Sequence, residues 1–180
     1  MIQTASKVVI VVFDGLRPDM VTPERMPNLA TFAGESLWFR QARSVFPSMT
    51  RVATSSISTG APPALHGIVG NSFYCPEVTR DFVLDTSLAE DLALAESRLA
   101  APLIEAETLG DRLAANGKHF AVVHSGSAGS TYAINPRAAA NGHWTFSVMG
   151  HACTRTPDAV DEVVARFGPL PPRTDRKSVV

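Results

Sequence analysis

The feature that most constrains the fold is a run of six apolar residues near the start of the chain, residues 8–13, followed by Asp14 and Gly15. The first five of these residues are valine or isoleucine, and β-branched residues favour strands. An apolar run without polar alternation is typical of a parallel strand that is buried on both faces. We therefore predict a strand over residues 7–13. Because ligands bind at the carboxyl ends of strands in open α/β sheets, Asp14 stands where a functional site is expected.

Helices and strands alternate along the rest of the sequence. The further elements that we predict are a short helix that opens at Pro27, a strand at 37–45, a helix at 50–59, a helix at 104–115, a strand at 120–124 and a helix at 157–167. A repeat of strand and helix predicts the α/β class, and 180 residues are enough for one domain with its own core. An apolar content of 45% with 18% charged residues excludes a disordered chain.

Charge and composition exclude several kinds of partner. The formal net charge of −1 provides no basic surface for a nucleic acid. No apolar run approaches the ~20 residues that cross a bilayer. The first residues lack a signal-peptide pattern, so we expect a cytoplasmic protein. Cys75 and Cys153 are far apart in the sequence, and two reduced thiols are favoured over a single disulfide.

Two residues are candidates for chemistry on phosphorus. Thr50 opens the predicted helix 50–59, where a hydroxyl residue is commonly an N-cap. The same position suits a nucleophile, because the backbone N–H groups and the helix dipole stabilise phosphoryl oxygens. A threonine hydroxyl needs activation by a base or a metal, and Asp14 could supply a metal ligand. The alternative for Asp14 is that it only begins a turn with Gly15.

The segment from His66 to Asn71 follows a proline-rich turn. Asn71 offers an uncharged amide donor for a phosphoryl oxygen, although a loop asparagine beside Gly70 is the structural alternative. His66 stands in a His-Gly pair, which is more often structural than metal-binding. Gly-rich residues 125–130 follow the predicted strand 120–124, but they have neither the Walker lysine nor a GxGxxG pattern.

The joint spacing of these residues is more specific than any one of them. Thr50 follows Asp14 by 36 positions, and Asn71 follows Thr50 by 21. Together with the Met-Pro-Asn-Leu segment that starts at Met26, this pattern resembles the opening of the type I phosphodiesterase/nucleotide pyrophosphatase family, in the alkaline phosphatase superfamily. The resemblance is strong over residues 7–75.

The resemblance implies an alkaline phosphatase-like fold, in which helices cover both faces of a mostly parallel sheet. It also implies two divalent metal ions, most often zinc, with Asp14 and Thr50 as ligands. Thr50 would be the catalytic nucleophile and form a phosphothreonyl intermediate, and Asn71 would bind a non-bridging phosphoryl oxygen of a phosphodiester or nucleotide-like substrate. The implied activity is hydrolysis of phosphodiester or pyrophosphate bonds.

The sequence departs from the family pattern after its first half. The family's later metal-binding motifs, Asp-x-x-x-His and Asp-His, do not occur in the chain. We therefore predict that residues 1–174 are the N-terminal part of a single catalytic domain. The sheet would be incomplete at the C-terminus, and the chain would be inactive alone. Residues 175–180, Asp-Arg-Lys-Ser-Val-Val, match what a sequencing adaptor encodes, and we predict a non-native tail there.

Two other functions fit parts of the pattern. Phosphonoacetate hydrolases, which cleave a C–P bond, resemble the chain around Pro47–Ser48 and residues 61–73, but they carry lysines after the strand that corresponds to residues 120–123. A non-catalytic binding module that kept the nucleophile half of the fold is the second alternative. Arg51 stands where the family often has an aromatic residue, which favours a smaller or more anionic substrate.

Overall fold

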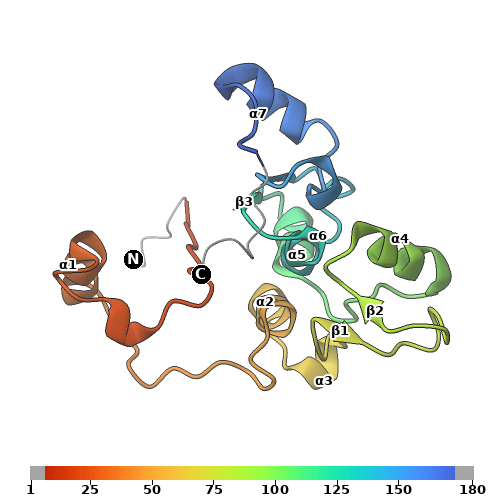
Figure 1. Cartoon of the computed structure of the whole chain (residues 1–180), viewed down its shortest axis with the longest axis horizontal. Helices are drawn as coiled ribbons and strands as arrows, with labels where there is room; N and C mark the ends of the chain where they lie inside the picture. The colour runs from red at the N-terminus through yellow and green to blue at the C-terminus, as the bar shows by residue number, and fades with distance from the viewer. Residues whose placement is uncertain (1–6, 173–180) are drawn as a thin grey trace. The chain divides into compact units, whose positions relative to one another are not determined.

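The chain divides into two units, Met1–Arg43 (unit 1) and Ser44–Val180 (unit 2), and the computed structural model describes residues 7–172 (Figure 1). The predicted non-native tail, residues 175–180, lies outside the described residues. The two units differ in their secondary structure. The described part of unit 1, residues 7–43, holds one α-helix and one short 3-10 helix, whereas unit 2 holds helices and paired strands.

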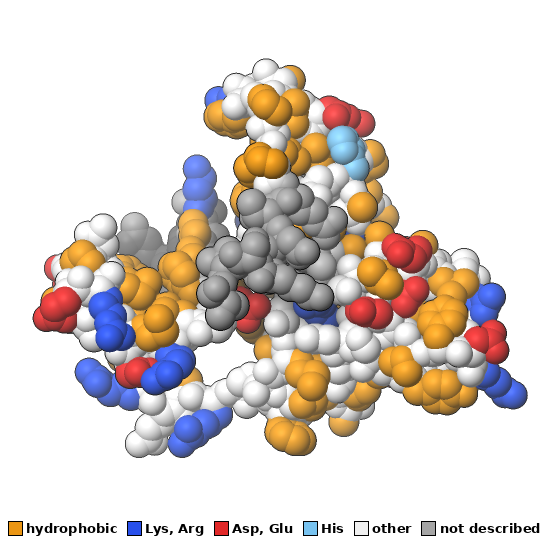
Figure 2. Space-filling view, viewed as in Figure 1, with side chains coloured by type: hydrophobic (Ala, Val, Ile, Leu, Met, Phe, Trp, Pro, Cys, Tyr) orange, Lys and Arg blue, Asp and Glu red, His pale blue; other side chains and the backbone are white. Residues whose placement is uncertain are grey.

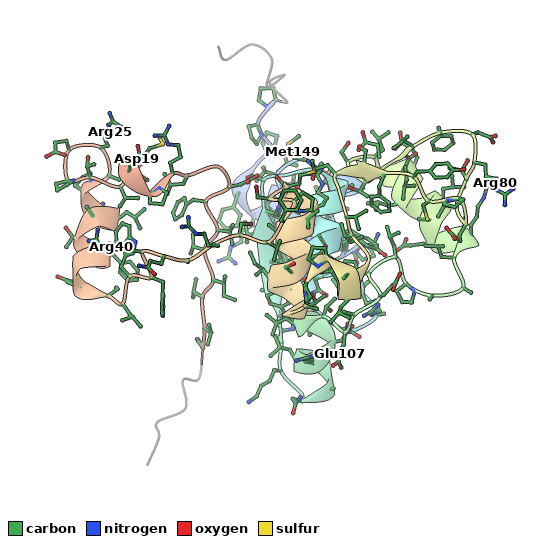
Figure 3. All side chains as sticks on the ribbon, turned by 90° about the horizontal axis from the view of Figure 1, so that it is seen from below. Asp19, Arg25, Arg40, Arg80, Glu107 and Met149 are labelled. Atoms are coloured by element: carbon green, nitrogen blue, oxygen red, sulfur yellow. The ribbon has the colours of Figure 1, made fainter. Side chains whose placement is uncertain are left out.

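Unit 1 contains the 3-10 helix η1 (Pro18–Met20) and the helix α1 (Pro27–Glu35). Pro27 occupies the first turn of α1, as predicted, because proline's fixed φ angle suits that position. Arg40 lies over the ring of Trp38, 5.4 Å from its centroid, and Figure 3 labels Arg40 beside α1. Neither helix buries a residue, so the described part of unit 1 has no core of its own.

The predicted strand over residues 7–13 is wrong. These residues form no strand, and the side chains of Val8 to Phe13 are between 53% and 84% exposed. A strand needs a neighbouring strand for its backbone hydrogen bonds, and a strand inside a sheet has one on each side. Among the described residues, both sheets pair two strands from unit 2 only. The apolar run is part of the hydrophobic surface that both units expose (Figure 2).

The predicted strand over residues 37–45 is also wrong. The chain turns at Arg40 and Gln41, where the Ala42 N–H donates to the Phe39 carbonyl at 3.1 Å. Leu37 and Phe39 are 81% and 72% exposed. The aromatic content gave this segment strand character, but a turn in its middle prevents continuous pairing.

Unit 2 follows a mixed order of helices and strands. Its elements are α2 (Thr50–Thr59), α3 (Pro63–His66), β1 (Ser72–Phe73), β2 (Leu84–Asp85), α4 (Ala89–Arg98), α5 (Leu109–Ala115), β3 (Ala121–His124), α6 (Ala128–Ile134), β4 (Trp144–Ser147), η2 (His151–Cys153) and α7 (Ala159–Phe167). The α2, β3 and α7 elements confirm three sequence predictions. No disulfide joins Cys75 and Cys153, as expected.

Two small sheets connect the helices of unit 2. Strands β3 and β4 are parallel, with Ala121 opposite Trp144 and His124 opposite Ser147. Strands β1 and β2 form an antiparallel pair in which Ser72 lies opposite Asp85. The combination of helices with a parallel pair confirms the α/β class. Arg80 lies at the outer end of the β1–β2 connection (Figure 3).

The main core lies between α2, α4 and α6. Val52, Leu84 and Ile104 are at most 1% exposed. The α2 and α6 helices approach closely because the facing residues are small. The Ser58 hydroxyl donates to the Ala133 carbonyl at 2.6 Å, and Ser58 is only 5% exposed. A second cluster packs α7 against β4 through Phe146, Ala159 and Val160.

Helix α5 is shorter than the predicted helix 104–115, because a capping box fixes its start. The Thr108 hydroxyl accepts from the Asp111 N–H at 3.3 Å, and the Asp111 carboxylate accepts from the Thr108 N–H at 2.9 Å. This reciprocal pair is a strong signal for a helix N-terminus. The prediction missed it, because the apolar pattern extends further back to Ile104.

The Asp111 carboxylate is also the centre of a charged network. The Arg137 guanidinium donates to both of its oxygens, and the Asn141 amide donates to Oδ1 at 2.9 Å. The hydrogen bonds from Arg137 hold the pKa of Asp111 well below its usual range. The carboxylate therefore stabilises the fold above the ordinary carboxyl pKa of ~4, and that stabilisation is lost as the pH falls through the folded-state pKa.

We expect Arg137→Met to lower the free energy of unfolding by about 1–2 kcal/mol at pH 7, since charge-assisted hydrogen bonds are lost. The difference from wild type should narrow below about pH 4, where the unfolded carboxyl binds a proton. Urea unfolding at pH 7 and pH 3 measures both effects. Arg112→Met is the control, because Arg112 pairs with Glu107 at the exposed surface. An equal loss in the control would contradict the prediction.

Candidate active site

The site begins at the N-terminus of α2. Met49 occupies the N-cap position in an extended conformation and makes no side-chain cap hydrogen bond. Thr50 is therefore the first helical residue and does not occupy the N-cap position that the sequence also suggested for it. Its side chain is partly exposed. The first N–H groups of a helix have no partner within the helix, and they carry partial positive charge.

Asn71 lies against this helix end although 20 residues separate it from Arg51. Its side-chain Oδ1 accepts a hydrogen bond from the backbone N–H of Arg51, at 3.1 Å. Only an acceptor can face an N–H group, so this contact fixes which end of the amide points to α2. The amide nitrogen of Asn71 donates to none of the described residues. The structure thus brings Asn71 to the turn that contains Thr50.

Asp14 belongs to unit 1, whereas Thr50 and Asn71 belong to unit 2. It lies in an exposed turn that the Leu16 N–H closes by donating to the Phe13 carbonyl at 3.2 Å. Gly15 has a φ angle of 77°, which glycine adopts without strain. Asp14 therefore begins a turn with Gly15. Its role as a metal ligand stays a prediction.

Metal-binding side chains do not gather in the described part of the chain. Among residues 7–172, no group of three or more histidine, cysteine, aspartate or glutamate side chains could hold an ion. His143 uses its Nδ1 atom to accept from the Phe120 N–H and its Nε2 atom to reach the Gly110 carbonyl. His151 pairs with Asp161 at the surface.

His66 is structural, as the sequence indicated. It is fully buried, and its Nδ1 accepts from the Ile68 N–H at 3.2 Å. Nε2 must therefore carry the proton, and it donates to the Ser56 hydroxyl at 2.9 Å. Burial lowers the pKa of His66. Both nitrogens are occupied within the fold, so His66 is not placed to bind a metal.

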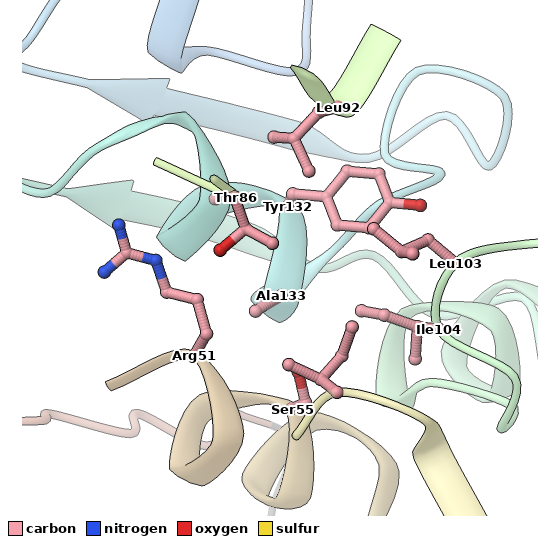
Figure 4. A pocket seen from close by; sticks show the side chains of 10 residues that line it. Arg51, Ser55, Thr86, Leu92, Leu103, Ile104, Tyr132 and Ala133 are labelled. Carbon is pink, nitrogen blue, oxygen red and sulfur yellow. The ribbon is translucent and has the colours of Figure 1, made fainter. Parts of the chain in front are cut away.

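Arg51 extends from α2 toward α6. Its Nη2 atom donates to the hydroxyl of Ser127, in the loop that connects β3 to α6. Figure 4 shows Arg51 and Ser55 projecting from α2 toward Thr86, Tyr132 and Ala133, around a cavity of about 10 Å³. A cavity of this size is comparable to a single water molecule. The arginine therefore links α2 to the loop after β3.

The backbone of Asn71 is held by Thr86, a residue that the sequence analysis did not identify. The Thr86 hydroxyl and the Thr86 N–H both donate to the carbonyl oxygen of Asn71, at 2.7 Å and 3.1 Å. Thr86 follows β2 directly and is 2% exposed. Strands of two residues carry no readable periodicity, so no local signal in the sequence connects Thr86 with Asn71.

Comparison with known proteins identifies the class of this chain. The sequence pattern of the type I phosphodiesterase/nucleotide pyrophosphatase family matches residues 8–176. The chain belongs to this family of phosphodiester and pyrophosphate hydrolases. No solved structure matches the chain significantly.

Individual relatives match a shorter segment. The chain is 33% identical over 81 residues to a bis(5′-adenosyl)-triphosphatase of Xenopus laevis, and the aligned segment covers 45% of this chain and 18% of that protein. It is 36% identical over 76 residues to a bis(5′-adenosyl)-triphosphatase of Bos taurus, covering 42% and 17%. An uncharacterized pyrophosphatase/phosphodiesterase of Schizosaccharomyces pombe is 35% identical over 78 residues, covering 43% and 16%. The matched segment spans less than a fifth of each relative.

Among residues 7–172, no helix is long and apolar enough to cross a bilayer.

We expect Ser56→Ala to lower the free energy of unfolding by about 1–3 kcal/mol, because it leaves the buried Nε2–H of His66 without an acceptor. Thermal and urea unfolding at pH 8 measure this loss. Ser97→Ala is the matched control, since the Ser97 hydroxyl donates to the Leu94 carbonyl on an exposed face of α4. Unchanged stability of the Ser56 variant would show that the histidine is not held as described.

Proposed function

We propose that this chain carries the nucleophile half of a metal-dependent hydrolase that cleaves phosphodiester or pyrophosphate bonds, with Thr50 as the nucleophile. The hydrogen bond from the Arg51 N–H to Asn71 Oδ1 carries the proposal. It brings Asn71 to the first turn of the ten-residue helix that Thr50 begins, and Thr50 and Asn71 are the two residues that the family pattern pairs. That location favours an anionic group.

The proposed chemistry begins with in-line attack of the Thr50 hydroxyl oxygen on phosphorus. A bond forms between this oxygen and phosphorus as the hydroxyl proton is lost to solvent, and the bond to the leaving oxygen breaks with its electron pair, after which the leaving oxygen takes up a proton from solvent. The Asn71 amide nitrogen donates to a non-bridging oxygen as negative charge develops there. Water then attacks the phosphothreonyl group, which releases the product and restores the Thr50 hydroxyl.

Two divalent metal ions, most often zinc in the proposed family chemistry, would lower the pKa of the Thr50 hydroxyl and neutralise phosphoryl charge. Asp14 and Thr50 are their predicted ligands. Residues 7–172 do not fit a complete two-metal site. Such a site needs further ligands, and no cluster of metal-binding side chains occurs in residues 7–172. We accordingly propose that this chain alone binds metal weakly and turns over negligibly.

The role of Thr50 is tested in the natural gene product that contains this chain, with bis(p-nitrophenyl) phosphate as substrate. Thr50→Ala should abolish turnover, and Thr50→Ser should keep part of it because the hydroxyl remains. Asn71→Ala should lower kcat by about 10²-fold, the usual cost of one oxyanion donor. Thr54→Ala, four residues further along α2, should change turnover little. Full activity of Thr50→Ala would refute the assignment.

Substrate preference gives an independent test. We expect the natural gene product that contains this chain to hydrolyse a nitrophenyl phosphodiester and diadenosine triphosphate, the substrate that the relatives' names suggest. We expect it to release no phosphate from phosphonoacetate. Two bound zinc ions per molecule are expected by elemental analysis. Hydrolysis of phosphonoacetate alone would favour a C–P bond hydrolase, and a metal-free, inactive gene product would favour a binding module.

A further inference from the structure

We propose that Thr86 is a positioning residue, which acts on catalysis through Asn71. The inference rests on the proposed function, in which the Asn71 amide binds a phosphoryl oxygen. A short side chain such as asparagine can place its amide accurately only if its own backbone is fixed. Thr86 is the residue that holds this backbone.

Two hydrogen bonds from one residue converge on the same oxygen. The Thr86 hydroxyl lies 2.7 Å and the Thr86 N–H lies 3.1 Å from the carbonyl oxygen of Asn71. The geometry extends the β1–β2 register, in which Ser72 lies opposite Asp85, so that Asn71 faces Thr86 as the next pair. The backbone bond alone would be an ordinary ladder contact. The hydroxyl adds a second donor from a buried side chain.

Helix α6 contacts the Thr86 backbone at its carbonyl oxygen. A Cβ atom added to Gly129 would lie 1.9 Å from the Thr86 carbonyl oxygen, so only glycine allows this approach. The same Cβ would lie 3.1 Å from Nε of Arg51. Figure 4 shows Thr86 between the α2 side chains and the α6 side chains. The Thr86 backbone is therefore packed against α6 at its carbonyl and bonded to Asn71 at its N–H.

The contacts form a continuous chain of support. The α6 backbone at Gly129 packs on Thr86, Thr86 holds the Asn71 carbonyl, and the Asn71 amide accepts from the Arg51 N–H in the first turn of α2. The amide that would meet the substrate thus has its orientation set from α2 and its position set from β2 and α6. Removal of the Thr86 hydroxyl weakens the second of these constraints.

The first test is steady-state hydrolysis of bis(p-nitrophenyl) phosphate by the natural gene product that contains this chain. Thr86→Val keeps the branched shape but loses the donor, and kcat/KM should fall about tenfold, mostly through kcat, because Asn71 is misplaced. Thr86→Ser keeps the hydroxyl donor and should retain most of the wild-type kcat/KM. Thr79→Val is the matched control, since Thr79 is also buried in the β1–β2 connection and accepts from the Asp81 N–H.

A double-mutant cycle tests whether Thr86 acts through Asn71. In an Asn71→Ala background, Thr86→Val should lower kcat/KM less than twofold, because the amide that it positions is absent. An unchanged tenfold loss in that background would overturn the proposal. So would equal effects of Thr86→Val and Thr79→Val on kcat/KM.

Hydrogen exchange separates this inference from the proposed function. If wild type does not hydrolyse the diester, the proposed function fails, but the support of Asn71 can still be measured by NMR. Exchange of the Arg51 amide proton should be several-fold faster in Thr86→Val and unchanged in Thr79→Val. Equal exchange of this proton in wild type and Thr86→Val would overturn the structural basis of the inference.

Discussion

The candidate site depends on one hydrogen bond, from the backbone N–H of Arg51 to the side chain of Asn71. This bond performs two tasks. It satisfies one of the N–H groups that every helix leaves unpaired at its start, where Met49 offers no capping group. It also points the oxygen of the amide toward α2, so that the NH₂ end of the amide faces away from the Arg51 N–H.

Close packing of α2 and α6 makes this arrangement possible. The serines and threonines of α2 give the segment a polar composition, but Ser55 and Ser58 are at most 5% exposed. Their small size lets the helices approach, and the hydroxyl of Ser58 satisfies a backbone carbonyl of α6. Gly129 continues the same close contact at the level of Thr86. The hydroxyl-rich sequence therefore serves packing first, and only Thr50 at its start is a candidate for chemistry.

Local signals in the sequence predicted the parts of the fold that depend on neighbouring residues. Helix α2 was predictable because Gly60, in a left-handed conformation, ends it as a C-cap glycine does. Strand β3 was predictable from the apolar run of Phe120 to Val123. The segment 7–13 is richer in β-branched residues and yet forms no strand, because pairing depends on other strands that its own sequence does not specify.

The candidate site was predictable to a similar extent. The spacing between Thr50 and Asn71 indicated a pair, and the structure brings Asn71 to the helix that Thr50 begins. The support from Thr86 was not predictable, since it arises from the register of two very short strands. The Asp111 network was missed for a related reason, because Arg137 lies 26 residues away and no local pattern joins them.

The chemistry of the donors around Thr50 explains why the proposed reaction includes metal ions. The helix N–H groups and the Asn71 amide are neutral donors, which can stabilise developing charge but cannot remove a proton. His66, the histidine that contacts α2, already has both ring nitrogens in hydrogen bonds. A threonine hydroxyl is a poor nucleophile near neutral pH without a base or a cation. In the proposed reaction the described part of unit 2 would therefore orient the phosphoryl group, and activation of Thr50 would have to come from groups beyond these neutral donors.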